Sequence, residues 1–260
     1  MTTRQTAARA LTVAAAMLGA WAGSAIAEAA ELKVLSGGAV RSIVTEMAEA
    51  FRQETGHTVQ FTFAPVGELR KKLSDGERAD VVILSDTVID QLMTEGVAAK
   101  GTRTDIARTG IGVAVREGAP RPDISTPEAF KQTLLAAKSL VYVDPARGAT
   151  SGVHFASVLA RLGIADAVKG KTTLVPGGYA AEVVAKGEAE LCVHQISEIL
   201  PVKGVTLVGP LPRELQKITT YSAAVGARTD APDAARAFTA FMTRPAFKPK
   251  LAAAGLDYRE

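Results

Sequence analysis

Cysteine and histidine are scarce in this 260-residue chain. Cys192 is the only cysteine, which excludes an intramolecular disulfide framework. One cysteine and three scattered histidines do not make a metal site. The sequence also lacks a dinucleotide-binding fingerprint and the spacing of a nucleophilic triad. These absences argue against redox enzymes and hydrolases, and we expect neither a cofactor nor a bound metal.

No segment beyond the first thirty residues is long and apolar enough to span a bilayer. The chain opens with two arginines, continues with a short apolar run over residues 10–21, and reaches a small-x-small site that ends at Ala27. This pattern predicts a secretory signal peptide, residues 1–27, with cleavage after Ala30 as an alternative. Because no cysteine lies at the cleavage site, we expect a soluble periplasmic protein without a lipid anchor.

The excess of positive charge nearly disappears in the mature chain. The full sequence has 30 Lys and Arg against 27 Asp and Glu, and the predicted signal peptide contains two of the arginines and no acid. Without them, 28 basic residues face 27 acidic ones. A chain so close to neutral gives no support for a nucleic-acid partner.

Strands and helices alternate along the first part of the chain, which predicts a parallel sheet with covered faces. The expected strands cover residues 31–35, 57–63 and 80–84, and the expected helices cover 40–53, 68–73 and 87–93. The second part continues with expected strands over 111–116, 140–143, 172–175, 190–195, 206–209 and 220–225 and expected helices over 127–137, 153–162, 179–186, 232–242 and 245–254.

Four loops of glycine, proline and small residues each follow a strand and precede a helix: residues 36–39, 64–67, 147–151 and 176–178. In open α/β sheets, ligands lie beyond the carboxyl ends of the strands. Helix N-termini that meet there favour an anion. The third loop adds the guanidinium of Arg147, and we expect Thr150 or Ser151 to cap the helix that follows it.

The order of elements, the segment Ala79–Asp86 and the pair Asp144-Pro145 resemble the periplasmic molybdate-binding proteins, which are solute receptors of ABC importers. The resemblance implies an α/β type II periplasmic binding protein, with two α/β lobes, a mixed sheet in each, and a ligand cleft and hinge between them. Lobe 1 is expected to comprise residues 31–116 and 202–260, and lobe 2 residues 117–201. An importer membrane component is the implied partner, and a monomer the implied state.

Molybdate-binding proteins hold their oxyanion with hydroxyls in the first two loops, backbone N–H groups of the third and fourth, and a tyrosine after a strand of lobe 2. Here those positions lack the expected side chains, since Ala39, Val66 and Gln195 occupy the hydroxyl and tyrosine positions. From the resemblance and the loops together, we expect the ligand to contact Ser36, Gly38, Ala39, Arg41, Val66, Gly67, Arg147, Thr150, Ser151, Gly178 and Gln195.

The departures from the family pattern favour an organic anion. A dehydrated tetrahedral oxyanion held by neutral donors would not need an arginine, whereas a carboxylate gains from the bidentate fork of Arg147. Arg41, at the start of the first helix, could hold a second carboxylate. The leading interpretation is therefore a periplasmic solute-binding protein for a small organic anion with two or three carboxylates.

Two alternatives remain open. The sequence also resembles aconitate isomerase, a cofactor-free enzyme of this superfamily that moves a proton along an allylic system. In that case His194, Glu68 or Tyr179 would carry the proton. Strand alternation sends His194 and Gln195 to opposite faces, so at most one of them faces the cleft unless the strand ends there, and we favour Gln195. The second alternative is a molybdate or tungstate receptor.

Overall fold

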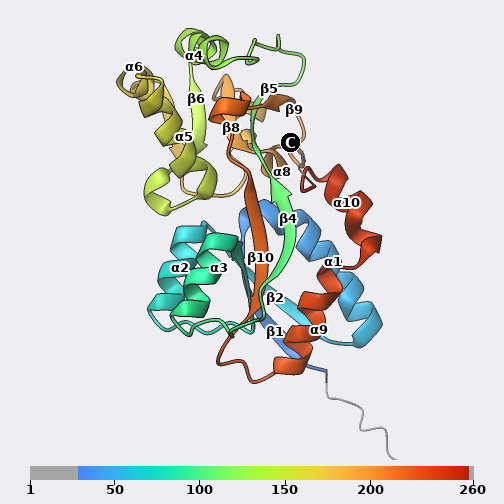
Figure 1. Cartoon of the computed structure of the whole chain (residues 1–260). Helices are drawn as coiled ribbons and strands as arrows, with labels where there is room; N and C mark the ends of the chain where they lie inside the picture. Colours follow the sequence, from blue (N-terminus) through green and yellow to red (C-terminus); the bar gives the residue numbers. More distant parts are fainter. Residues whose placement is uncertain (1–28, 258–260) are drawn as a thin grey trace, which may run out of the picture.

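Two five-stranded mixed sheets divide the chain into two lobes (Figure 1). The computed structural model describes residues 29–257. The first sheet has the strand order β2 (Thr58–Ala64), β1 (Glu31–Gly37), β3 (Val81–Ser85), β10 (Thr219–Val225) and β4 (Thr104–Thr109). The second has the order β7 (Thr172–Val175), β6 (Leu140–Val143), β8 (Leu191–Gln195), β5 (Ile111–Arg116) and β9 (Val205–Pro210).

Helices cover both faces of the first sheet. Figure 1 shows α1 (Arg41–Thr55), α9 (Pro232–Met242) and α10 (Lys248–Ala253) on one side, and α2 (Val66–Ser74) and α3 (Asp86–Thr94) on the other. Helix α1 buries an apolar stripe that includes Ile43, Met47 and Phe51, and Phe51 packs against Phe238 of α9 with ring centroids 5.1 Å apart. Because both faces are covered, β3 is buried along its whole length.

The second sheet follows the same plan, with five helices around it. They are α4 (Pro127–Ala136), α5 (Thr150–Arg161), α6 (Ala165–Lys169), α7 (Ala181–Ala185) and α8 (Ile196–Ile199). Short 3-10 turns η1 (Gly38–Val40), η2 (Pro145–Arg147), η3 (Arg213–Leu215) and η4 (Pro245–Phe247) join elements in both lobes. Helix α5 packs so closely on β6 that a Cβ on Gly152 would lie 2.1 Å from the carbonyl oxygen of Val143.

The first sheet is mixed, as the resemblance implied, because β10 runs antiparallel to both β3 and β4. The strand–helix order of the first part of the chain predicted only its parallel strands. The strand β4 was not expected at all. The lobe boundaries also shift: β5 and β9, expected in lobe 1, pair with each other and with β8 in the second sheet. The chain therefore changes sheets at Gly110 and between residues 210 and 219, and not at residues 116 and 202.

The side-chain amide of Gln216 bridges the two connections between the lobes. Its Nε2 donates to the carbonyl oxygen of Ile111 at 2.8 Å, and its Oε1 accepts from the N–H of the same residue at 2.8 Å. Ile111 begins β5 directly after the first crossing, and Gln216 lies in the second. This amide therefore takes the place of a strand partner where the chain passes between lobes.

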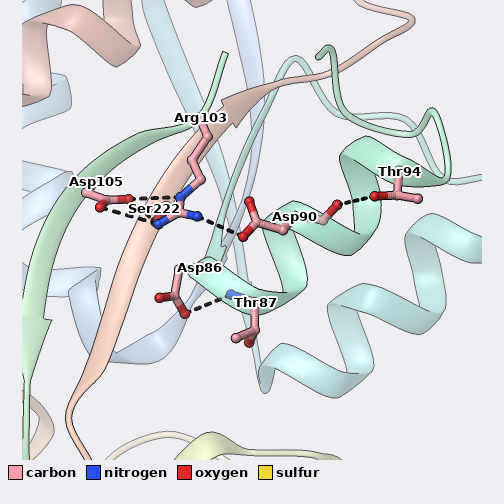
Figure 2. A network of polar contacts seen from close by, with 7 residues as sticks. All are labelled: Asp86, Thr87, Asp90, Thr94, Arg103, Asp105 and Ser222. Carbon is pink, nitrogen blue, oxygen red and sulfur yellow. Dashed lines mark hydrogen bonds and ion pairs between the residues drawn. The ribbon is translucent and has the colours of Figure 1, made fainter. Parts of the chain in front are cut away.

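A polar network ties the outer part of lobe 1 together (Figure 2). Arg103 donates to Asp90 of α3 at 2.8 Å and to Asp105 of β4 at 3.0 Å, and Ser222 of β10 donates to Asp105 at 2.7 Å. The hydrogen bonds to Asp105 and Asp90 raise the pKa of Arg103. The network fixes β4 against β10 and α3 just before the first crossing.

The predicted signal peptide, residues 1–27, lies outside the described residues. Within residues 29–257, none of the helices has the length and apolar character needed to cross a membrane.

Candidate functional site

A cavity of about 290 Å³ lies between the two lobes, where the four small-residue loops converge. Most of the residues expected to bind a ligand line it: Gly38, Ala39, Arg41, Val66, Arg147, Thr150, Ser151, Gly178 and Gln195. Two of the three expected proton carriers, Glu68 and His194, line it as well. The loops meet because each follows the carboxyl end of a strand that points toward the cleft.

Three expected site residues lie outside the cavity lining. Ser36 is fully buried in lobe 1, where its hydroxyl donates to the carbonyl oxygen of Gly37 at 3.1 Å. Tyr179 lies beside Arg41, whose guanidinium carbon is 5.9 Å from the centre of its ring. Gly67 lies where the two lobes touch, against Gly148.

The second and third loops are in direct contact across the cleft. The N–H of Gly67 donates to the carbonyl oxygen of Gly148 at 3.1 Å. A Cβ on Gly67 would lie 2.7 Å from the Cα of Gly148 and 3.2 Å from the carbonyl oxygen of Arg147. Gly148 itself has φ +70°, a conformation that favours glycine. The two glycines thus allow the lobes to approach backbone to backbone.

Arg147 and Glu68 also pair across the cleft. An Nη2 of Arg147 donates to Oε2 of Glu68 at 2.7 Å, and the two side chains are 46% and 32% exposed. An exposed pair of this kind contributes little to stability. In this arrangement the carboxylate of Glu68 occupies one edge of the guanidinium that the sequence assigns to a ligand.

Arg41 is held by stacking. Its guanidinium carbon lies 4.5 Å from the centre of the Phe63 ring, a cation–π distance. Phe63 and Arg41 come from β2 and the first turn of α1, and both line the cavity. Within the described residues, Arg41 forms no ion pair with a carboxylate, so its donors are available to a ligand.

The N-terminus of α5 is open toward the cavity. Ala149 is the N-cap, and no side chain caps this helix, so the expected capping by Thr150 or Ser151 was wrong. The Ser151 hydroxyl instead lies 3.0 Å from Nδ1 of His194. Because Ala149, Thr150 and Ser151 line the cavity, the first-turn N–H groups and the positive end of the helix dipole are placed for an anion.

His194 and Gln195 both line the cavity, because strand β8 ends at Gln195 and strict alternation no longer applies there. Nε2 of His194 lies 3.0 Å from the carbonyl oxygen of Gly178. Since a carbonyl can only accept, Nε2 carries a hydrogen and donates it. Both ring nitrogens of His194 are therefore engaged.

Gln195 is 1% exposed and lies beside the Tyr221 hydroxyl. Neither the oxygen nor the nitrogen of its side-chain amide makes a hydrogen bond of good geometry within residues 29–257. A buried amide left without partners costs about 1–3 kcal/mol. Its position in the cavity wall makes a ligand the natural partner.

Sequence reasoning missed two buried cavity residues, Glu198 and Tyr221. Glu198 lies in α8, and its Oε2 is 3.6 Å from Nε2 of His194. Burial raises the pKa of Glu198, while the positive charges of His194 (when protonated) and Arg41 oppose that shift. Burial also raises the pKa of Tyr221, and Glu198 adds to the effect. Glu198 lies four positions after His194, but His194 belongs to strand β8 and Glu198 to α8, so no helical spacing in the sequence pointed to the pair.

No three His, Cys, Asp or Glu side chains in the described part of the chain come together as a metal site would require. The cavity thus offers two guanidiniums, a helix N-terminus, an unpaired amide and a buried carboxyl–imidazole pair. Such a set can hold an anion with several carboxylates and can exchange a proton with it.

Comparisons with known proteins agree with this geometry. Residues 32–257 match the family described as bacterial extracellular solute-binding protein. An aconitate isomerase from a Pseudomonas species is 37% identical over 217 residues, which cover 81% of each chain. The molybdate-binding protein ModA of Azotobacter vinelandii is 30% identical over 186 residues, which cover 70% of this chain and 71% of that protein.

Solved structures extend the likeness to the fold. The periplasmic molybdate-binding protein of Azotobacter vinelandii superposes with a TM-score of 0.73 at 20% identity, covering 88% of this chain and 100% of that one. The expected type II fold with two α/β lobes is thereby confirmed, as is the resemblance to the molybdate-binding proteins.

Proposed function

The chain belongs to the bacterial extracellular solute-binding proteins, and we propose that it encloses an unsaturated tricarboxylate of the aconitate type and interconverts its cis and trans isomers. The observation that carries this proposal is the buried carboxyl of Glu198 in a cavity otherwise suited to anions. A carboxylate there would repel an anionic ligand. A carboxyl that exchanges a proton with the ligand gives this position a chemical role.

The size of the cavity favours an organic ligand. Its volume is about 290 Å³. That space suits a tricarboxylate better than a single tetrahedral oxyanion. The hydroxyl positions of the molybdate-binding pattern are also filled by Ala39 and Val66, which donate no side-chain hydrogen bond. A molybdate receptor is therefore the weaker interpretation.

The reaction requires a clamp and a proton carrier. Arg41, Arg147 and the N-terminus of α5 are placed to hold carboxylates, which fixes the allylic carbons relative to the cavity wall. A base removes a proton from the methylene carbon, and the electron pair spreads into the neighbouring carboxylate. Return of a proton to the far end of the allylic system moves the double bond by one position. The step needs no oxidant, reductant or cofactor.

The relative named aconitate isomerase supports this assignment, since its 37% identity extends over 81% of both chains. The second candidate is a receptor that delivers a polycarboxylate to an ABC importer. The family membership and the two-lobed closure around the cavity favour it. The sequence alone ranked the receptor first. The buried carboxyl of Glu198 reverses that order. For either function we propose a monomer that is exported to the periplasm without a lipid anchor.

The test uses the mature protein, incubated separately with cis-aconitate, trans-aconitate, the saturated analogue tricarballylate, citrate, sulfate and molybdate. Thermal shift reports binding, because a ligand stabilises the folded state by mass action. Chromatography of the aconitate samples reports interconversion. We expect shifts with the tricarboxylates, and both aconitate samples reaching one common mixture. Binding without interconversion would establish the receptor, and a shift with molybdate alone would contradict both candidates.

A further inference from the structure

We infer that Glu198 is the catalytic residue that takes and returns the proton, and that His194 is the positioning residue that holds its carboxyl toward the substrate. The inference rests on the proposed isomerase function and names the group that performs its chemical step. It replaces the three expected carriers, His194, Glu68 and Tyr179.

The surroundings of Glu198 leave its carboxyl free to react. The side chain is 9% exposed, lines the cavity, and has no hydrogen-bond partner among residues 29–257. Its Oε1 approaches the backbone of the first loop so closely that a Cβ on Gly38 would lie 2.6 Å away. Only glycine at position 38 leaves room for the carboxyl in this place.

The other candidates are each engaged elsewhere. Both ring nitrogens of His194 have partners, Ser151 and Gly178, so neither is free to receive a proton from carbon. Glu68 is paired with Arg147 at the rim. Tyr179 lies outside the cavity lining. The carboxyl of Glu198 is the one acid or base of this set that faces the cavity without a hydrogen bond in the described structure.

The groups that face Glu198 come from four elements. Nε2 of His194, on β8, lies 3.6 Å from its Oε2, and Arg41 of α1 acts on it as a positive charge. Burial raises the pKa of Tyr221 of β10 and of the Cys192 thiol of β8, and the negative charge of Glu198 adds to both shifts. Tyr179, which precedes α7, feels the same charge. Burial outweighs the cations and raises the pKa of Glu198, which makes its carboxylate a stronger base.

One carboxylate suffices for the proton balance. The Glu198 carboxylate removes a proton from the methylene carbon, that C–H bond breaks, and its electron pair enters the dienolate. The resulting carboxylic acid gives a proton to the other terminal carbon of the allylic system, where a C–H bond forms. In D₂O, exchange of the carboxyl proton with solvent before this return brings deuterium into aconitate. Because one group does both, the proton leaves and returns on the same face, and the enzyme ends in its starting state.

The experiment compares wild type, Glu198→Gln, Glu198→Asp and the control Glu188→Gln, whose side chain is exposed outside the cavity. We expect Glu198→Gln to lower kcat by about 10²- to 10⁴-fold, the usual contribution of a general acid or base. The Kd for tricarballylate should stay within fivefold of wild type or become tighter. Glu198→Asp should fall between the two in kcat, and the control should match wild type.

Three further readouts separate catalysis from structure. Incorporation of deuterium from D₂O into aconitate should be lost with Glu198→Gln. Gly38→Ala, which displaces the carboxyl without removing it, should lower kcat more than it changes the Kd for tricarballylate. His194→Asn should shift the pH dependence of kcat, which a purely structural role would not do.

Interconversion by wild type together with a kcat within tenfold of wild type for Glu198→Gln would overturn the role of Glu198 and leave the proposed function intact. Binding without interconversion by wild type would overturn the function itself. If Glu198→Gln does not fold, Glu198→Asp and Gly38→Ala decide: full activity in both overturns the inference.

Discussion

Closure of the two lobes depends on the contact between Gly67 and Gly148, and the substitution Gly67→Ala tests it. The added Cβ would lie 2.7 Å from the Cα of Gly148, whereas carbon atoms pack at about 3.5–4.0 Å. The loops must therefore separate by about 1 Å at this point. Overpacking of this kind costs about 1–3 kcal/mol. Because the clash exists only when the lobes are closed, the cost falls on ligand binding, which should weaken by about 5- to 150-fold.

Calorimetric titration with tricarballylate, which cannot isomerise, measures this loss directly. Gly67 lies in the first turn of α2, where alanine favours the helix more than glycine does. Thermal unfolding without ligand should therefore be unchanged or slightly higher. Gly170→Ala is the matched control, since a Cβ there meets nothing within 4 Å. Wild-type affinity in Gly67→Ala would refute the idea that ligand binding requires this contact.

Four other variants test separate parts of the site. Arg147→Ala should weaken tricarballylate binding by about 1.5–3 kcal/mol, the scale of a charge-assisted hydrogen bond. Glu68→Gln, which frees the Arg147 guanidinium, should leave the calorimetric Kd equal to that of wild type or tighter. Equal losses of affinity in both variants would mean that the Arg147–Glu68 pair only holds the two lobes together. Gln195→Met should raise the melting temperature of the unliganded protein, because it removes an unpaired buried amide, and should weaken binding; a lower melting temperature with unchanged affinity would contradict this. Glu198→Gln should become more stable relative to wild type as pH rises from about 4 to about 8. The pKa of Glu198 is raised in the folded protein. Wild type therefore loses free energy of unfolding from the unfolded pKa of about 4.3 upward, by at most about 1.4 kcal/mol per pH unit. Urea titrations across that range check the sign, and a pH-independent difference would refute it.

Local patterns in the sequence predicted most elements of the fold. The apolar stripe of α1 and the strand–loop–helix order placed four loops at one cleft. The antiparallel direction of β10 was not predictable in this way, because it follows a long excursion through the second lobe. β4 escaped notice because its sequence, Thr-Asp-Ile-Ala-Arg-Thr, mixes charged and apolar residues without a clear period. Its exposed polar side chains reflect its position at the edge of the sheet.

The residues that loops bring to the candidate site were predictable from the sequence. The residues that reach it through contacts between distant elements were not. Arg41, Arg147 and Ser151 lie in or beside the expected loops, and the structure brings them together. Tyr221 reaches the cavity only because β10 lies beside β3, a long-range pairing. The environment of Glu198 depends on its close approach to Gly38, and these two residues lie 160 positions apart in the sequence. Neither contact has a local sequence signature.

Unpaired and constrained groups gather around the cavity. The Gln195 amide makes no hydrogen bond of good geometry within residues 29–257, Glu198 is a buried acid, and Gly67 and Gly148 touch backbone to backbone. Each costs stability in the unliganded chain. Their concentration at one cleft is typical of a site that a ligand completes.

The most direct test of the central claim is proton NMR of mature wild-type protein with cis-aconitate in D₂O. Allylic proton transfer predicts that trans-aconitate appears and that deuterium enters the methylene or vinyl positions at a rate tied to turnover. The same equilibrium mixture should form from trans-aconitate. Saturation with cis-aconitate while neither isomer nor deuterium content changes would contradict the isomerase and leave a polycarboxylate receptor.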